Sequence, residues 1–476
     1  MRGRLLLAGA LVALLALGGC SHEPPYGTTS QEAIAAYDKG MEDFGKFYYA
    51  DALKEFEQAT EADSGFAIAW ARIAQIHFRT SNHGEARSAM ERALEFSDRA
   101  TRHEGYYIRM LDHLVSFEFD SAGATADSLI AAYPDDKEAY LQRGSLFEIK
   151  RNYEQAIQMY QRAAALDTAY AQAYMFLGYA YSSIGEQEKA LRFMRRYISL
   201  APQAGDPRAS YADLLVRVGR YDEALDQYQK SLEIKPDYWY AMLQIARVYA
   251  TMGRLRESDV YMQQAITLLP PTVNRELMTL TTSAGYDMNR GEYRKAADQY
   301  AKALTLDNRS GSAAYGYCGA LTRLEQPAQA RQVLAGILEE LDRRNLQGTP
   351  AMLDYYLMRS RIAMIEDSLE AAKADCDTAL SYATLLTRPY VYRQIAEIDL
   401  RTKDFESALA ACEEALAVNP NEPLILLTLT RVYHAMGDAR MTREIGSRLT
   451  KFWAESDSDF VYRKELRRIL GRLPAA

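Results

Sequence analysis

The sequence is poor in the residues that build most catalytic and metal sites. It has 4 Cys, 6 His and 3 Trp among 476 residues, and no CxxC pair. Phosphate-binding glycine loops, GxSxG elbows and HExxH pairs are also missing; His103-Glu104 begins such a pair, but no second histidine follows at the required spacing. We therefore expect no enzymatic activity, no cofactor and no metal ion.

The sequence also lacks an excess of positive charge and long apolar runs. Its formal net charge is −8 and no basic domain stands out, so we expect no nucleic-acid partner. No apolar run reaches the roughly 20 residues that a membrane-spanning helix needs. Tyrosine is abundant instead, at 34 residues against 14 Phe. Most tyrosines fall at positions that repeat along the chain, which favours a role in the core.

The first thirty residues differ in composition from the rest. Arg2 and Arg4 precede the 13 apolar residues Leu5 to Leu17, a length typical of a secretory signal. The run ends in LGGCS at 17–21, which resembles the end of a bacterial lipoprotein signal peptide.

This resemblance implies a signal peptide over residues 1–19, and a lipidated Cys20 with a short tether over residues 20–30. Acyl chains on Cys20 would hold the mature protein on a membrane. Ser21 fits the pattern that directs lipoproteins to the outer membrane in well-studied Gram-negative bacteria. The alternative is a plain secretory peptide in which Cys20 has no role.

Small residues recur along the chain at a fixed interval. Ala156, Ala190, Ala224 and Ser258 lie 34 residues apart, and prolines at 202, 236 and 270 repeat at the same step. Residues 171–202 also carry an ordered set of aromatic and small residues, namely Tyr174, Leu177, Gly178, Tyr181, Ala190 and Pro202. This step and these positions resemble the tetratricopeptide (TPR) repeat.

The resemblance implies an all-α fold, a right-handed α-solenoid of stacked antiparallel helix pairs. Weaker copies extend from about residue 33 to 456, which gives about twelve repeats. In the copy that follows Pro202, we expect Asp206 to cap the first helix and Gly219 to separate it from the second. Because two helices cannot cover their own apolar faces, each copy must stack on its neighbours.

The repeat spacing lengthens near Pro270-Pro271 and within residues 345–350. We therefore expect an N-terminal array over 31–272 and a C-terminal array over 273–456. A basic helix over 457–476 is predicted to cap the open end of the array, with contact to anionic lipid or an acidic partner as the alternative. Cys318, Cys376 and Cys412 are predicted to be buried thiols, although a disulfide between the last two remains open.

In proteins that this chain resembles, the first helices of the repeats line a concave groove for a partner protein. The resemblance therefore implies that the groove binds an extended or helical segment of a protein. Glu138, Glu148, Asp206 and Asp213 fall on its N-terminal half. The predicted partner-binding residues are Tyr179, Tyr240, Arg247, Tyr315, Arg323, Arg361, Tyr390, Arg393 and Arg431. The alternative for the arginines is an ordinary solvated surface.

These features predict a non-enzymatic, lipid-anchored TPR scaffold that mediates protein–protein interactions at the bacterial cell envelope, in assembly or secretion. A surface lipoprotein that binds a glycan or nutrient on a TPR platform is the alternative.

Overall fold

The computed structural model describes residues 25–80, 82–269, 274–344 and 346–473. Within these residues the regular elements are 25 α-helices and one 3-10 turn, η1 (Ser97–Arg99), and there is no strand. The all-α prediction is therefore confirmed.

The first helices of the pairs are α1 (Gln31–Gly45), α3 (Ala67–Arg79), α5 (Arg102–Val115), α7 (Lys137–Ile149), α9 (Ala171–Ser183), α11 (Asp206–Arg217), α13 (Trp239–Thr251), α15 (Arg275–Arg290), α17 (Gly311–Arg323), α19 (Met352–Ile365), α21 (Arg388–Thr402) and α23 (Pro423–Met436). The second helices are α2 (Tyr49–Ala62), α4 (His83–Glu95), α6 (Phe119–Ala132), α8 (Tyr153–Leu166), α10 (Gln187–Leu200), α12 (Tyr221–Ile234), α14 (Leu255–Leu268), α16 (Tyr293–Leu306), α18 (Pro327–Arg343), α20 (Leu369–Tyr382), α22 (Phe405–Val418) and α24 (Ala439–Phe452), and α25 (Val461–Leu470) follows the last pair.

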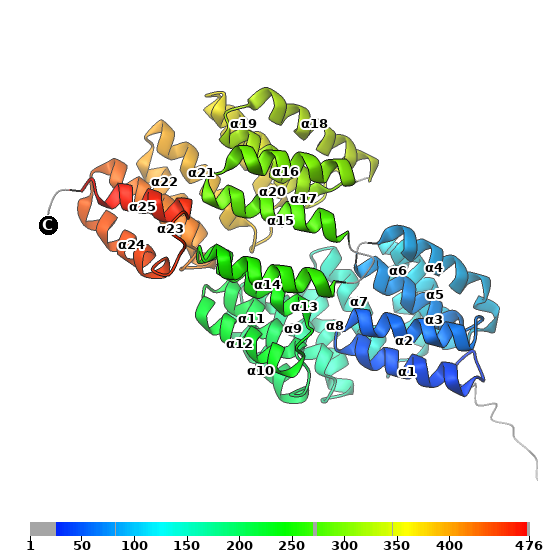
Figure 1. Cartoon of the computed structure of the whole chain (residues 1–476). Coiled ribbons are helices and arrows are strands. Elements are labelled where there is room, and N and C mark those ends of the chain that lie inside the picture. Colours follow the sequence, from blue (N-terminus) through cyan, green and yellow to red (C-terminus); the bar gives the residue numbers. More distant parts are fainter. Residues whose placement is uncertain (1–24, 81, 270–273, 345, 474–476) are drawn as a thin grey trace, which may run out of the picture. The chain divides into compact units, whose positions relative to one another are not determined.

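Within each of the two compact units described below, consecutive helices pack in pairs and each pair stacks on the next (Figure 1). Twelve pairs, α1/α2 to α23/α24, are present in the described residues, as predicted from the repeat. Ala156, Ala190, Ala224 and Ser258 are fully buried on the second helices. Small side chains at these positions let the two helices of a pair approach closely.

Glycines on first helices allow an equally close approach. A Cβ added at Gly144 would lie 2.3 Å from Tyr160 Cε1, and one at Gly316 would lie 2.3 Å from Tyr300 Cε1. The Tyr160 ring of α8 therefore rests directly on the backbone of α7 in its own pair, and the Tyr300 ring of α16 rests on the backbone of α17, the first helix of the next pair. Tyr160 and Tyr300 are buried, in agreement with a core role for the repeated tyrosines.

The chain divides into two compact units. The first comprises residues up to Glu42 together with Asp51–Leu129, and the second comprises Asp43–Ala50 together with residues from Ile130 onward. Within the second unit, the turn between α1 and α2 is bonded to later repeats, because the Tyr48 hydroxyl accepts a hydrogen bond from the Gly205 amide at 2.8 Å. Residues 270–273 lie outside the described residues, and the predicted division into arrays over 31–272 and 273–456 stays a prediction.

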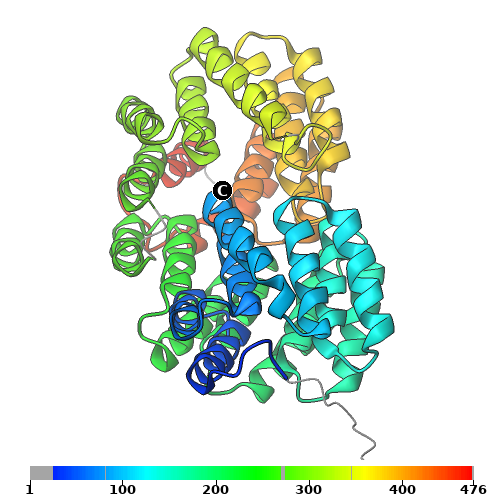
Figure 2. The ribbon, with the colours of Figure 1, turned by 90° about the vertical axis from the view of Figure 1, so that its right-hand side faces the viewer.

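Inside the second unit, C-terminal repeats contact the turns of earlier ones. The turns within four consecutive pairs, at Arg151, Gly185, Gly219 and Gly253, lie 34 residues apart and all have positive φ. Loops of the C-terminal pairs, at residues 382–385, 419–422 and 453–460, pack on these turns. We call this set the closing contacts, and Figure 2 shows the yellow-to-red helices of this unit beside its cyan and green ones.

The closing contacts combine hydrogen bonds with tight packing. The Asp457 amide donates to the Gly253 carbonyl at 2.9 Å, and the buried Trp453 donates its indole N–H to the Thr251 carbonyl at 3.2 Å. A Cβ at Gly253 would lie 2.5 Å from a ring carbon of Phe460. Because Gly253 also has a φ of +74°, any other residue there would be both strained and in collision.

The helix predicted near the C-terminus is α25, which begins at Val461 and ends at Leu470. It packs on α23 and α24 through the buried Leu466 and Ile469, and it also contacts α15. An ion pair of 3.3 Å between Arg290 and Asp459 accompanies this second contact. Within residues 275–470, the last helix of the chain therefore lies against both the last pair and α15.

Cys318, Cys376 and Cys412 are buried free thiols, as predicted, and no disulfide links them. Burial raises the pKa of Cys318 to about 12 and that of Cys376 to about 11. The predicted signal peptide and Cys20 lie outside the described residues. Among the helices that the structure describes, none combines the length and apolar character needed to cross a bilayer.

Ala224→Glu tests the predicted repeat register. The substitution places a carboxylate in a fully buried contact, where we expect a cost of about 3 kcal/mol or more. Amide hydrogen exchange should show loss of protection centred on residues 205–269, because each repeat packs mainly on its neighbours. Gln229→Glu, on the exposed face of the same helix, is the control and should leave protection unchanged. Unaltered protection in Ala224→Glu would contradict the register.

Candidate functional site: an arginine pocket

The first helices of the C-terminal pairs surround a cavity of about 320 Å³. Its lining comes from α15, α17, α19, α21, α23 and α25, with one residue from α16. We call this cavity the arginine pocket, because five arginines line it: Arg323, Arg361, Arg393, Arg401 and Arg431. Among the described lining residues, Glu397 is the one acidic side chain. The pocket is therefore strongly positive.

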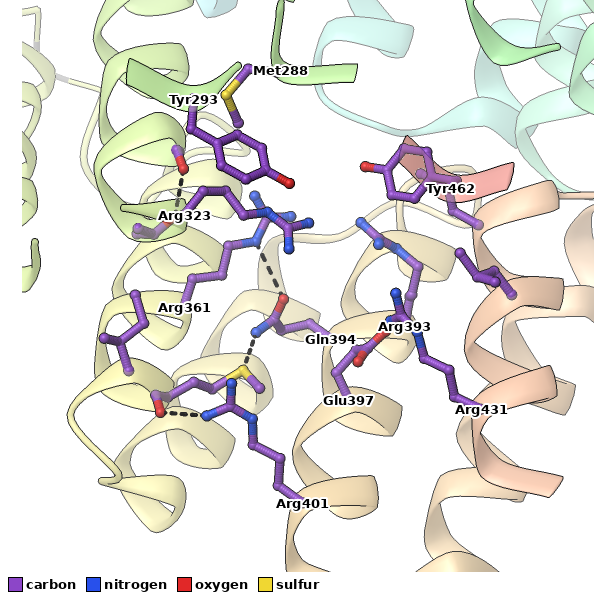
Figure 3. Close-up of a pocket in the computed structure, with 16 residues that line it drawn as sticks. Met288, Tyr293, Arg323, Arg361, Arg393, Gln394, Glu397, Arg401, Arg431 and Tyr462 are labelled. Carbon is purple, nitrogen blue, oxygen red and sulfur yellow. Dashed lines mark hydrogen bonds and ion pairs between the residues drawn. The ribbon is translucent and has the colours of Figure 1, made fainter. Parts of the chain in front are cut away.

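Four consecutive first helices each contribute one of the arginines that were predicted to bind a partner. Arg323, Arg361, Arg393 and Arg431 follow one another at steps of 38, 32 and 38 residues. The stacking of the pairs brings these side chains together, and Figure 3 shows them entering the same space. Whether they bind a partner stays a prediction.

Arg431 and Arg401 are engaged by the protein itself. Arg431 forms a two-pronged ion pair with Glu465 of α25, at 2.7 Å for each pair of atoms, and a second ion pair with Glu397. Arg401 donates to the Met364 carbonyl at 2.7 Å. These contacts fix both side chains, and they neutralise the charge of Glu397.

The other three arginines form what we call the arginine triad: Arg323, Arg361 and Arg393. Arg361 donates from Nε to the neutral Gln394 at 3.3 Å. In the part of the chain that the structure describes, none of the three has an ion-pair partner. Burial, followed by repulsion from Arg393 and Arg323, lowers the pKa of Arg361 to about 10. At neutral pH the triad therefore carries three mutually repelling positive charges.

Two tyrosines complete this part of the pocket. Figure 3 shows the hydroxyls of Tyr293 and Tyr462 facing the triad from opposite sides. The Arg323 guanidinium lies 5.9 Å from the centre of the Tyr293 ring. Sequence reasoning missed both residues, since Tyr293 is on a second helix and Tyr462 is on the terminal helix. Tyr293 stands at the same repeat position as Tyr153 and Tyr221, which indicates a packing role, and Tyr462 has no counterpart in the repeats.

The remaining predicted residues lie elsewhere. Tyr315 lines a neighbouring hollow together with Asp354 and Arg361. Tyr390 is 55% exposed, and Arg247 is exposed on α13 with a weak hydrogen bond to Gln244 at 3.4 Å. Neither Tyr390 nor Arg247 is among the described residues that line the arginine pocket.

Tyr179 and Tyr240 are brought together around a carboxylate. Both donate their hydroxyls to Asp213 Oδ2 at 2.8 Å, and Tyr228 donates to Asp213 Oδ1 at 2.6 Å. Burial raises the pKa of Asp213. These tyrosine hydroxyls are therefore already satisfied within the protein.

Asp206 has a different role from the one predicted. Gly205 stands at the cap position of α11, and Asp206 is the first helical residue, with its side chain buried. Its carboxylate accepts hydrogen bonds from Tyr197 at 2.9 Å and Tyr238 at 2.8 Å. The prediction of a helix cap is wrong, because the carboxylate is directed into the core by these two tyrosines.

Comparison with known proteins identifies the repeats. Residues 44–101 and 112–171 match one tetratricopeptide-repeat model, and residues 171–203, 208–238 and 240–270 match another. These parts of the chain therefore carry tetratricopeptide repeats, as the sequence indicated. Such repeats form scaffolds for protein–protein interaction.

The curated relatives are distant. Anaphase-promoting complex subunit 3 of Schizosaccharomyces pombe is 20% identical over 71% of this chain and 48% of its own length. DnaJ homolog subfamily C member 3 of Gallus gallus is 22% identical over 78% of this chain and 71% of its own length. The chain spans about half the length of the first of these proteins.

The solved structures that resemble this chain are distant as well. A tetratricopeptide repeat protein from Parabacteroides merdae has 16% identity and a TM-score of 0.34, with 59% of this chain and 93% of that chain covered. The crystal structure of MamA has 26% identity to this chain and a TM-score of 0.29. The match covers 33% of this chain and 93% of that chain.

Asp206→Asn tests the buried carboxylate. Burial outweighs the hydrogen bonds from Tyr238 and Tyr197 and raises the pKa of Asp206 from 3.8 to about 6. The folded state therefore holds the proton more tightly than the unfolded state. The stability that protonation gives at low pH is lost as the pH rises from about 4 to 6.

Asparagine cannot ionise, so Asp206→Asn should not show this loss. We expect its unfolding free energy, relative to wild type, to rise by about 2–3 kcal/mol between pH 4 and pH 7 in denaturant titrations. Asp222→Asn, at an exposed position on α12, is the control and should run parallel to wild type. If the unfolding free energy of the wild type ran parallel to that of Asp206→Asn as the pH changes, Asp206 would titrate normally.

Proposed function

We propose that this chain is a non-enzymatic, lipid-anchored scaffold that binds a protein partner through the arginine pocket at the bacterial cell envelope. The observation that carries the proposal is the convergence of Arg323, Arg361 and Arg393, from three consecutive first helices, on one cavity. Stacked repeats hold these arginines on rigid elements, so that a partner meets a preformed surface.

The charge of the pocket indicates the kind of partner. Arginine forks pair best with carboxylates and phosphates, and they contribute most where water is partly excluded. An acidic segment of a partner protein suits the pocket, and the exposed Tyr390 adds apolar area on the same helix as Arg393. By its name, one relative is a subunit of a complex, which accords with a scaffold role.

The location rests on the N-terminal sequence. Residues 1–19 have the pattern of a lipoprotein signal, Cys20 follows it, and Ser21 favours the outer membrane. In this proposal the acyl chains retain the repeats on the membrane while the pocket recruits a partner in assembly or secretion.

Cys20→Ser tests the anchor. In a Gram-negative host, the wild-type chain should enter the detergent phase on partitioning and incorporate labelled fatty acid. The variant should lose the label and move to the aqueous phase, because the remaining apolar run is only 13 residues long. Ser21→Ala changes a neighbouring residue without removing the thiol and serves as the control. Equal membrane retention of Cys20→Ser would refute the anchor.

Charge reversal in the pocket tests partner binding. Envelope proteins cross-linked to the wild type and identified by mass spectrometry should be lost in Arg323→Glu/Arg393→Glu. Capture by the wild type should weaken as salt rises from 0.05 to 0.5 M, since exposed charges are screened over about 8–10 Å near physiological ionic strength. Arg192→Glu/Arg294→Glu, at exposed positions on the second helices α10 and α16, makes the same charge change outside the pocket and should retain the partner. If both double variants capture the same proteins, recognition lies elsewhere on the chain.

A further inference from the structure

We propose that the arginine triad, Arg323, Arg361 and Arg393, is a built binding site for the phosphoryl group of a small phosphate ester. The proposal goes beyond the function proposed above, because it names a small-molecule ligand for the same pocket and does not depend on a protein partner. The Tyr293 and Tyr462 hydroxyls supply two further donors beside the guanidinium groups (Figure 3).

The excess of positive charge in the pocket favours the binding of an anion. Arg431 already has two carboxylates, Glu397 and Glu465. The triad has no such ion-pair partner in the described residues. The hydrogen bond of Arg361 goes to the neutral side chain of Gln394. Grouping three unpaired guanidinium groups costs free energy through repulsion and loss of hydration. A bound anion offsets both costs.

Nearby carboxylates do not fulfil this role. Asp354, in the neighbouring hollow, attracts Arg361 electrostatically without forming an ion pair. Burial raises the pKa of Asp354. Glu422 acts on Arg393, and it accepts a hydrogen bond from Tyr221 at 3.2 Å. Neither carboxylate is among the described residues that line the arginine pocket. The centre of the triad therefore retains its positive charge.

The arrangement of the donors favours a phosphoryl group over a carboxylate. The three guanidinium groups come from three helices, α17, α19 and α21, and the two phenols approach from α16 and α25. A carboxylate is planar and offers two oxygens and one charge. A phosphate monoester offers three oxygens in a tetrahedral arrangement and nearly two charges at neutral pH. A phosphate monoester can therefore accept hydrogen bonds from several directions at once.

The pocket also has room for the rest of such a ligand. Its volume of about 320 Å³ is at the lower end of the roughly 300–1,000 Å³ that small-molecule sites occupy, and it exceeds the needs of a phosphoryl group alone. Apolar side chains, including Met288, Met364, Leu424 and Leu427, line the remainder. A small organic phosphate ester matches both parts of the pocket.

Calorimetric titration of the purified mature chain tests the site. The probes are inorganic phosphate, pyrophosphate, glycerol 3-phosphate, phenyl phosphate and citrate. We expect phenyl phosphate to bind more tightly than inorganic phosphate, because its ring occupies the apolar part of the pocket. Arg361→Gln and Arg393→Gln should each weaken binding about 10-fold or more, as loss of a charged hydrogen-bond donor does. Arg192→Gln, at an exposed arginine of α10 outside the pocket, is the control and should bind as wild type does.

Thermal unfolding provides a second readout that does not depend on the ligand. Because the triad is held together against repulsion, Arg361→Gln should raise the melting temperature of the ligand-free protein, by on the order of 1–2 °C. A purely structural arginine would lower it. Arg393→Gln, whose side chain has no ion-pair partner in the described residues, should shift the temperature in the same direction.

The outcomes separate this inference from the proposed function. Failure of every phosphate probe to bind, or equal binding by Arg361→Gln, overturns the inference. Citrate binding more tightly than every phosphate probe also overturns it, in favour of a carboxylate ligand. Loss of partner capture with intact phosphate binding would overturn the proposed function and leave the inference standing. Binding of inorganic phosphate or pyrophosphate with rejection of both esters would identify a free inorganic anion as the source of the phosphoryl group.

Discussion

The two helices of each pair pack closely together, and the regular stacking of the repeats follows from this close approach. It requires a small residue, such as Ala224, on the second helix, and in the α7/α8 pair a glycine, Gly144, under a tyrosine ring. Because the geometry within each pair is constant, the displacement and rotation from one pair to the next are nearly constant too. Because each first helix then repeats in nearly the same orientation, arginines spaced 32 to 38 residues apart in the sequence meet in one pocket.

The second unit adds a long-range constraint to this local one. The turns at Gly219 and Gly253 are packed against loops about 200 residues later, and α25 contacts α15 as well as α23. Arg431 is held by Glu465 of α25, and Tyr462 of the same helix lines the pocket. The C-terminal helix therefore takes part in the site, in addition to covering the end of the last pair. Phosphate binding in the pocket should for this reason stabilise the position of α25.

The helices and their pairing could be predicted because each repeat carries its own local signals. Ala224 and the period of 34 residues report contacts between neighbouring helices, and Gly219 marks the turn between the two helices of a pair. The projection of Arg323, Arg361, Arg393 and Arg431 toward one side also followed from the period. The closing contacts could not be predicted, since Gly219 and Gly253 look like any other turn glycines in the sequence. The same reason applies to Tyr462 and to the tyrosines that enclose Asp206, because the contacts of these residues join non-neighbouring segments.

In the proposal made here for the arginine pocket, the triad is held in place to receive an anion. Crystal structures of the mature chain, with and without phenyl phosphate, test this most directly. We predict tetrahedral density between the Arg323, Arg361 and Arg393 guanidinium groups, with Tyr293 and Tyr462 within hydrogen-bond distance of it. The ligand-free crystal should show the same side-chain positions. Density elsewhere on the chain, or ligand-free arginines turned away from one another toward Asp354 and Glu422, would contradict the account.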